Sequence, residues 1–301
     1  TQVTPILIGL GLSLSSEKSE EFVQFWAYFH HYSHSMTDIR LIATDMDGTL
    51  LNSKSELDAS FFTLFSQLRA QGILFAAASG RQYYNLAKYF DAVKDDMFFV
   101  AENGSYVMHR GEEVYVQSLE LSIARQMIEI ARTIPNTYII LCGKKKAYVE
   151  SNVPKFWDQV TRHFEQYQLV EDLTTIEDDQ CLKVSLCDFD GSANNSYPYF
   201  QPWEQELQVK VSGGKWLDIS HKLANKGQAL KVLQEKYGIA PEQTMAFGDY
   251  LNDLEMMQQA HHSYAMENAH PAIKEAARFQ AKSNDEKGVF EVLNELITCL
   301  I

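Results

Sequence analysis

The chain has few basic residues for its acidity. It holds 26 lysines and arginines against 40 aspartates and glutamates, a formal net charge of −14 at pH 7. Because nucleic acids and anionic membranes repel a protein of this charge, we expect neither as a partner. An anionic substrate would then need a local positive charge or a metal ion at its binding site.

Cysteines and long hydrophobic runs are also scarce. The four cysteines (Cys142, Cys181, Cys187 and Cys299) include no Cys-x-x-Cys pair, so no disulfide framework is indicated and we expect a reducing, cytoplasmic environment. The longest apolar stretch, residues 6–14, is too short to cross a bilayer and lacks the basic flank of a signal peptide. The composition favours a globular protein, and 301 residues are enough for two domains.

Two patterns of predicted elements divide the chain. Residues 37–118 and 223–301 alternate short apolar runs with amphipathic helices, which is typical of a parallel sheet covered by helices. Residues 119–222 mix hairpin-like strand pairs with helices, which indicates a separate inserted module. Residues 1–36 fit neither pattern and are predicted to be an N-terminal extension outside the fold. We predict an α/β fold, a doubly wound and mostly parallel sheet with an inserted α+β domain.

The individual elements follow from apolar periodicity and from turn residues. Helices are predicted between the strands, one of them with a capping-box-like start at Ser55-x-x-Asp58 and another with Phe156, Val160, Phe164 and Tyr167 on one face. The predicted strands are 39–44, 73–78, 98–101, 244–247 and one near Tyr264 in the alternating part, and 137–141, 147–150, 181–187, 209–211 and 216–219 in the inserted part.

Two aspartates stand at the end of the first predicted strand. Residues 43–50 read Ala-Thr-Asp-Met-Asp-Gly-Thr-Leu, and carboxylates in this position are costly unless a cation or hydrogen bonds compensate them. Alternate side chains of an extended segment project to the same side, so Asp45 and Asp47 could address one centre. Gly48 would let the backbone turn away sharply. The alternative interpretation is a simple Asp-Gly turn after a strand.

Further polar residues lie at or just beyond the ends of other predicted elements. The ends of neighbouring strands converge in a doubly wound sheet, so these groups should meet. Oxygen ligands suit Mg²⁺, and a lysine and a hydroxyl suit the remaining phosphate oxygens. One aspartate could attack phosphorus while a second moves the proton. No P-loop or Rossmann fingerprint competes with this interpretation. The groups are Asp45 with Asp47, Ser79, Lys226, and Asp249 with Asn252 and Asp253.

From about Met36 to its end, the chain resembles a known enzyme family. It is similar to phosphatases of the haloacid dehalogenase (HAD) superfamily, specifically the Cof-type subclass with an α+β (type IIB) cap, in a Rossmann-like HAD core. The motifs that carry the resemblance occur in order at suitable separations. They are Asp45-Met46-Asp47-Gly48-Thr49, Ser79-Gly80-Arg81, Asn225-Lys226-Gly227 and Gly248-Asp249-Tyr250-Leu251-Asn252-Asp253.

The resemblance implies a role for each matching residue. Asp45 would be the nucleophile that becomes an aspartyl-phosphate, and Asp47 would protonate the leaving oxygen and then activate water. Mg²⁺ would bind the Asp45 carboxylate, the Asp47 backbone carbonyl and Asp249, with Asp253 in support. Glu102-Asn103-Gly104 also matches a family segment near the site, but no role follows for it. The residues expected to bind the phosphoryl group are Met46, Ser79, Gly80, Lys226 and Asn252.

We therefore expect a Mg²⁺-dependent phosphatase that hydrolyses small phosphorylated metabolites, with sugar phosphates as the favoured class. One alternative is a phosphotransferase or mutase that passes the phosphoryl group to an acceptor hydroxyl. Another is a receiver-like signalling module in which a phosphorylated aspartate persists. Such a module needs neither the proton-shuttling Asp47 nor a large inserted cap, so the sequence disfavours it.

Overall fold

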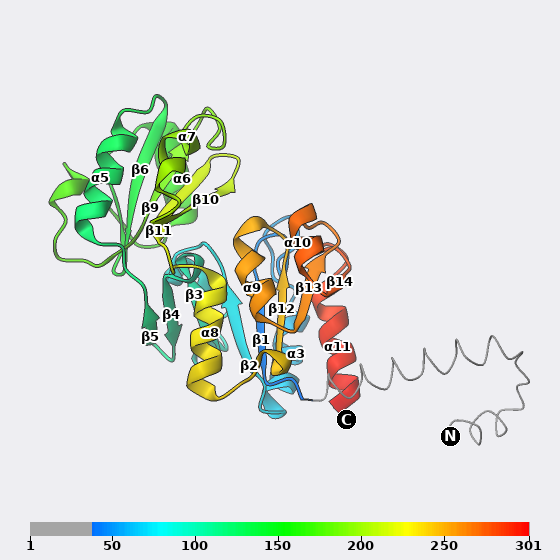
Figure 1. Ribbon diagram of the computed structural model, residues 1–301. Coiled ribbons are helices and arrows are strands. Elements are labelled where there is room, and N and C mark those ends of the chain that lie inside the picture. The colour runs from blue at the N-terminus through cyan, green and yellow to red at the C-terminus, as the bar shows by residue number, and fades with distance from the viewer. Residues whose placement is uncertain (1–37, 301) are drawn as a thin grey trace, which may run out of the picture.

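The computed structural model describes residues 38–300, which form two β-sheets (Figure 1). The larger sheet has eight strands in the order β14-β13-β12-β1-β2-β3-β4-β5, and the smaller has six in the order β10-β11-β9-β6-β7-β8. Figure 1 shows the smaller sheet and its helices as a body of their own, next to one end of the larger sheet. The predicted extension, residues 1–36, lies outside the described residues.

The eight-stranded sheet is parallel except at one edge. Strand β1 pairs in parallel with β2 and β12. The antiparallel pairs are β3 with β4 and β4 with β5. All five residues of β1 are buried, because helices cover both faces of such a sheet. The strands are β1 (Leu41–Asp45), β2 (Leu74–Ala78), β3 (Phe98–Ala101), β4 (Tyr106–His109), β5 (Glu112–Val116), β12 (Thr244–Gly248), β13 (His262–Met266) and β14 (Phe279–Ala281).

The helices of this part fall on opposite faces of the sheet. Helix α3 connects β1 to β2, and α9 connects β12 to β13, and these two connections run in opposite directions across the sheet. Because such crossovers are right-handed, the two helices lie on opposite sides of the sheet. Helix α11 contacts α3, whereas α8 and α10 contact α9. The helices are α3 (Ser60–Ala70), α4 (Tyr83–Lys88), α8 (Lys226–Tyr237), α9 (Leu254–Gln259), α10 (Pro271–Ala276) and α11 (Gly288–Leu300).

The six-stranded sheet has hydrophobic clusters of its own. Its strands pair antiparallel except for β7 and β8, which are parallel. Its elements are α5 (Leu121–Arg132), β6 (Thr137–Gly143), β7 (Ala147–Val149), α6 (Pro154–His163), β8 (Tyr167–Leu169), β9 (Cys181–Asp188), α7 (Tyr197–Phe200), β10 (Leu207–Gly213) and β11 (Trp216–His221).

The predicted α/β fold with a mostly parallel sheet is confirmed, but several local predictions are wrong. The capping box at Ser55 does not form, because α3 begins at Ser60 and Ser55 has a left-handed φ of 60°. The helix expected to include Phe164 and Tyr167 ends at His163, where the backbone becomes extended. Strands β4, β5, β8 and β14 were not predicted. The domain boundaries at 118/119 and 222/223 stay predictions.

Candidate active site

The order of the strands brings three of the predicted groups to one edge of the sheet. Asp45 is the last residue of β1, and it lies opposite Ala78, so Ser79 follows directly beside it. On the other side, β12 pairs with β1 and ends at Gly248, so Asp249 emerges at the same edge. The chain leaves β1 toward one side of the sheet for β2 and returns on the other for β12. Ligands of open α/β sheets bind at such a reversal.

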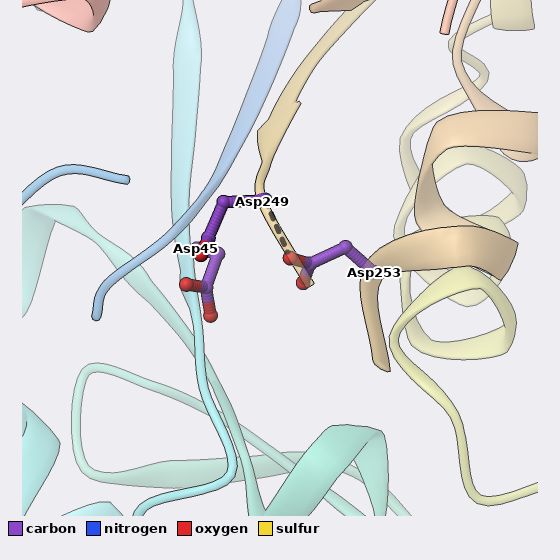
Figure 2. Close-up of side chains that lie close together, drawn as sticks. All are labelled: Asp45, Asp249 and Asp253. Carbon is purple, nitrogen blue, oxygen red and sulfur yellow. Dashed lines mark hydrogen bonds between the residues drawn. The ribbon is translucent and has the colours of Figure 1, made fainter. Parts of the chain in front are cut away.

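A buried cluster of carboxylates surrounds Lys226. Oxygens of Asp45, Asp249 and Asp253 all lie within 4.8 Å of one another, and Figure 2 shows the Asp45 and Asp249 side chains adjacent, with Asp253 reaching toward them from its own segment. The Lys226 ammonium is fully buried and donates to Asp45 and, at 2.6 Å, to Asp253. The cluster therefore holds three carboxylates against one ammonium.

The electrostatics of this cluster favour an additional cation. Burial raises the pKa of Asp45, the Lys226 ammonium opposes that shift, and the Asp253 and Asp249 carboxylates add to it. Burial and the Asp253 charge raise the pKa of Asp249 to about 6. A divalent cation among these oxygens would balance the excess negative charge, and carboxylate ligands are those that Mg²⁺ prefers. The residues present thus fit the predicted metal ion.

Local structure holds Asp253 and Asp249 in place. Asp253 accepts from the backbone N–H groups of Asp249 and Tyr250 at 2.9 and 3.1 Å, which closes the turn after β12. The Thr49 hydroxyl donates to Asp249 at 2.9 Å. Gly48 has a φ of 82°, and a Cβ there would lie 2.4 Å from an Asp249 oxygen. Only glycine allows the two segments to approach this closely.

Lys226 owes its position to the start of helix α8. Asn225 is the N-cap, and its side-chain oxygen accepts from the Gln228 backbone N–H at 2.8 Å. This cap satisfies one of the backbone donors at the helix end and fixes where the helix begins. Lys226 is the first helical residue, so the cap also sets the point from which its side chain enters the cluster.

A cavity of about 560 Å³ opens above the carboxylates, between the two sheets. Ser79 and Asn252 lie on its wall, whereas Lys226 does not line it and sits behind Asp45. The six predicted residues that line the cavity are Asp45, Asp47, Ser79, Gly80, Asp249 and Asn252, and the smaller sheet and its helices contribute others, among them His163, Lys183 and Asp218.

Comparison with known proteins identifies the family. A model of the haloacid dehalogenase-like hydrolases matches residues 42–293. The chain belongs to this family. The 5-amino-6-(5-phospho-D-ribitylamino)uracil phosphatase YbjI of Escherichia coli (strain K12) is 34% identical over 269 residues, which cover 86% of this chain and 96% of that protein.

Two solved structures share the fold of this chain over most of its length. A crystal structure from Streptococcus mutans UA159 is 32% identical, with a TM-score of 0.79 over 86% of this chain and 99% of the other. A structure described as a HAD subclass IIB sugar phosphatase has a TM-score of 0.72 over 85% of this chain and 98% of the other. At 19% identity it shows the shared fold alone. The protein is an enzyme, a HAD-like phosphatase that acts on phosphorylated substrates.

Asp47 differs from the other predicted residues of this HAD-like site in its surroundings. Its side chain is 51% exposed and faces Arg81, whose Nε and Nη2 donate to the two carboxylate oxygens at 2.7 and 2.5 Å. Arg81 also donates to Asn85 and to Tyr89, both at 3.0 Å. Arg81 belongs to the predicted Ser79-Gly80-Arg81 motif, but its pairing with Asp47 was not predicted. Met46 has a fully buried side chain, so only its backbone could reach a substrate.

Proposed function

We propose that this enzyme is a Mg²⁺-dependent phosphatase of small phosphorylated metabolites and that it works through an aspartyl-phosphate on Asp45. The observation that carries the proposal is the Asp45 carboxylate at the base of the cavity, held by buried Lys226 and adjacent to Asp249. Such a carboxylate is fixed in place and open on the cavity side, as an attacking group must be.

Asp45 and Asp47 then carry out hydrolysis in two steps. An Asp45 oxygen attacks phosphorus as the bond to the leaving oxygen breaks, and Asp47 gives that oxygen a proton. Water then attacks the phosphoryl group on Asp45 while Asp47 takes a proton from it, which releases phosphate and restores the Asp45 carboxylate. For both steps Asp47 must exchange its present contact with Arg81 for the substrate.

Other residues position the phosphoryl group. Ser79, the Gly80 amide, the Met46 backbone and Asn252 would donate to its oxygens, while Lys226 would hold Asp45 in line. The carboxylates of Asp45 and Asp249 and the Asp47 backbone carbonyl would hold the Mg²⁺. When bound, this ion would neutralise charge on the phosphoryl oxygens. Asp253 would support the site through the turn after β12.

The cavity and the YbjI relative support the proposed substrate class. Residues 119–222 would act as a cap domain, because both sheets line the space above Asp45. A cavity of about 560 Å³ suits a small molecule rather than a polymer. The YbjI relative is named for a phosphorylated ribityl compound, and we propose sugar phosphates or closely related polyol phosphates here. Four free thiols among the described residues support the proposed cytoplasmic location.

A panel of phosphorylated metabolites with Mg²⁺ tests this proposal. We expect phosphate release from sugar or polyol phosphates with water as the sole acceptor. Transfer to an added sugar hydroxyl in place of phosphate release would favour a phosphotransferase or mutase instead. A stable phosphoprotein without turnover would favour the signalling alternative. Either result would contradict the hydrolase proposal.

A further inference from the structure

The segment Glu102-Asn103-Gly104, between β3 and β4, has an unusual backbone. Its three residues have φ values of 51°, 55° and 93°. Left-handed conformations cost free energy for residues other than glycine and persist where the surroundings impose them, often at functional sites. Glu102 is only 1% exposed. One of its carboxylate oxygens lies 2.9 Å from the ammonium of Lys183, so this buried carboxylate has a charged partner.

This segment holds the loop that carries Ser79 and Gly80. The Asn103 backbone N–H donates to the Ser79 carbonyl, and the Glu102 N–H donates to the Arg81 carbonyl, both at 3.0 Å. The carbonyl between these two, that of Gly80, has a partner of a different kind. It accepts at 2.9 Å from the ammonium of Lys183, a residue of β9 in the other sheet.

Lys183 is itself held by buried carboxylates. Its ammonium lies 2.9 Å from Glu102 and 3.3 Å from Asp218, and its side chain is 5% exposed. Asp218 accepts from the Ser185 hydroxyl and, at 2.9 Å, from the Asn103 amide. Burial would lower the pKa of Lys183, but the Asp218 and Glu102 charges outweigh it and raise the pKa. The side chain is therefore a fixed cation that joins the two sheets.

The Gly80 carbonyl belongs to the same planar peptide unit as the Arg81 N–H. That N–H donates to the Ser79 hydroxyl oxygen at 3.2 Å. Because this bond occupies a lone pair of the oxygen, the hydroxyl hydrogen is left to donate elsewhere, and Ser79 lines the cavity. Fixing the Gly80 carbonyl thus fixes the direction in which Ser79 can donate.

We propose that Lys183 is a positioning residue that orients the Ser79 hydroxyl toward the phosphoryl group through the Gly80–Arg81 peptide. The phosphate loop, Ser79-Gly80-Arg81, is then correctly oriented only when β9 of the smaller sheet lies where this structure has it. Glu102 and Asp218 hold the ammonium for this purpose, which gives the Glu102-Asn103-Gly104 segment a role. The inference rests on the proposed phosphatase function of the Asp45 site.

The substitution Lys183→Met tests the inference, with Lys210→Met as its matched control. Lys210 also joins the two parts, through an ion pair of 3.1 Å with Glu255, but it contacts no residue of the phosphate loop. The readouts are hydrolysis of p-nitrophenyl phosphate with Mg²⁺ and inhibition by inorganic phosphate. Lys183→Met should lower kcat/KM and raise the inhibition constant by about ten-fold, as expected for a lost charge-assisted hydrogen bond. Lys210→Met should change both by less than about two-fold.

A double-mutant cycle with Ser79→Ala separates positioning from general structural damage. If Lys183 acts through the Ser79 hydroxyl, the effect of Lys183→Met should largely disappear in the Ser79→Ala background. An equal effect in both backgrounds, or equal losses in Lys183→Met and Lys210→Met, would overturn the inference. So would unchanged phosphate inhibition with losses that differ among leaving groups, because Lys183 would then contact the substrate itself.

Lys183→Met leaves two buried carboxylates without their cation and could prevent folding. The double substitution Lys183→Met with Glu102→Gln keeps the net charge of the group and serves as the second test, with the same expected losses. Thermal unfolding of each variant confirms that it is folded. A wild-type protein that hydrolyses no phosphate ester would refute the proposed function, whereas an active wild type with an equally active Lys183→Met would refute this inference alone.

Discussion

Asp45 and Asp47 lie two residues apart yet occupy different environments. Asp45 is 6% exposed and paired with a buried lysine, whereas the Asp47 side chain is 51% exposed and paired with Arg81 at the cavity wall. A buried, fixed carboxylate suits attack on phosphorus, and a half-exposed one at the cavity wall suits proton transfer. Replacing Asp45 and replacing Asp47 should therefore affect hydrolysis in different ways.

The two replacements can be told apart with two leaving groups. Asp45→Asn should abolish hydrolysis of p-nitrophenyl phosphate and of a sugar phosphate alike, because both need the nucleophile. Asp47→Asn should nearly abolish phosphoryl transfer from the sugar phosphate, whose alkoxide needs a proton, but spare the first step with p-nitrophenyl phosphate. Rapid-quench measurement of the p-nitrophenol burst gives the rate of that step. Equal slowing with both substrates would mean that Asp47 holds geometry or metal instead of moving a proton.

At the scale of elements, strand and helix ends determine where the chemistry lies. Strand β1 ends at Asp45, Asp249 directly follows the last residue of β12, and α8 begins at Lys226. Gly104 supports that helix start, because a Cβ on it would lie 2.3 Å from the Asn225 carbonyl oxygen. Displacing the first turn of α8 should therefore affect both stability and catalysis.

The substitution Asn225→Ala tests the helix start, with Asp58→Ala as its control. Asp58 accepts from the Ser60 N–H at 2.9 Å, so it provides a similar bond at the start of α3, away from the cavity. Each substitution should lower the free energy of unfolding by about 1 kcal/mol, measured by urea denaturation. Only Asn225→Ala should also lower kcat/KM, because Lys226 follows it directly. Equal kcat/KM values for the two variants would contradict this prediction, because the N-cap of α8 would then have no effect on catalysis.

The sequence predicted the elements that carry strong local patterns and missed those that depend on distant partners. Each reactive aspartate follows a run of apolar residues, so the sheet edge could be inferred. The β4–β5 hairpin could have been predicted from the glycine in Arg110-Gly111. These two residues have φ values of 53° and 73°, which fit a two-residue turn. Strand β8 is short and exposed and has little pattern. Lys183 was not singled out, because its contact with Gly80 joins residues that lie 103 positions apart in the chain.

At the scale of the whole molecule, a strongly acidic protein binds an anionic substrate. Its net charge of −14 repels phosphate esters at a distance. Within the site, the local cations are Lys226, Arg81 and Lys183, and all three are bonded to carboxylates. None of the helices described over residues 38–300 is long and apolar enough to span a membrane. Because the three local cations are already bonded to carboxylates, a bound divalent cation would supply the positive charge that the substrate requires.

Metal removal tests this balance of charge. Treatment with EDTA should abolish hydrolysis, and added Mg²⁺ should restore it, because the three carboxylates around Lys226 leave excess negative charge where the phosphoryl group must bind. The chelated protein should stay folded by circular dichroism, which shows that the loss lies in the chemistry. Full turnover in rigorously metal-free buffer would contradict the account.

The most direct measurement of the central claim is the capture of the phosphoryl group on the enzyme. Wild-type protein is mixed with p-nitrophenyl phosphate and Mg²⁺, quenched in acid during turnover, digested and analysed by mass spectrometry. The account predicts one phosphoryl group on the peptide that contains Asp45, located at that residue by fragmentation, more of it in Asp47→Asn and none in Asp45→Asn. Turnover at the same rate in Asp45→Asn, or a phosphoryl group on another residue, would contradict it.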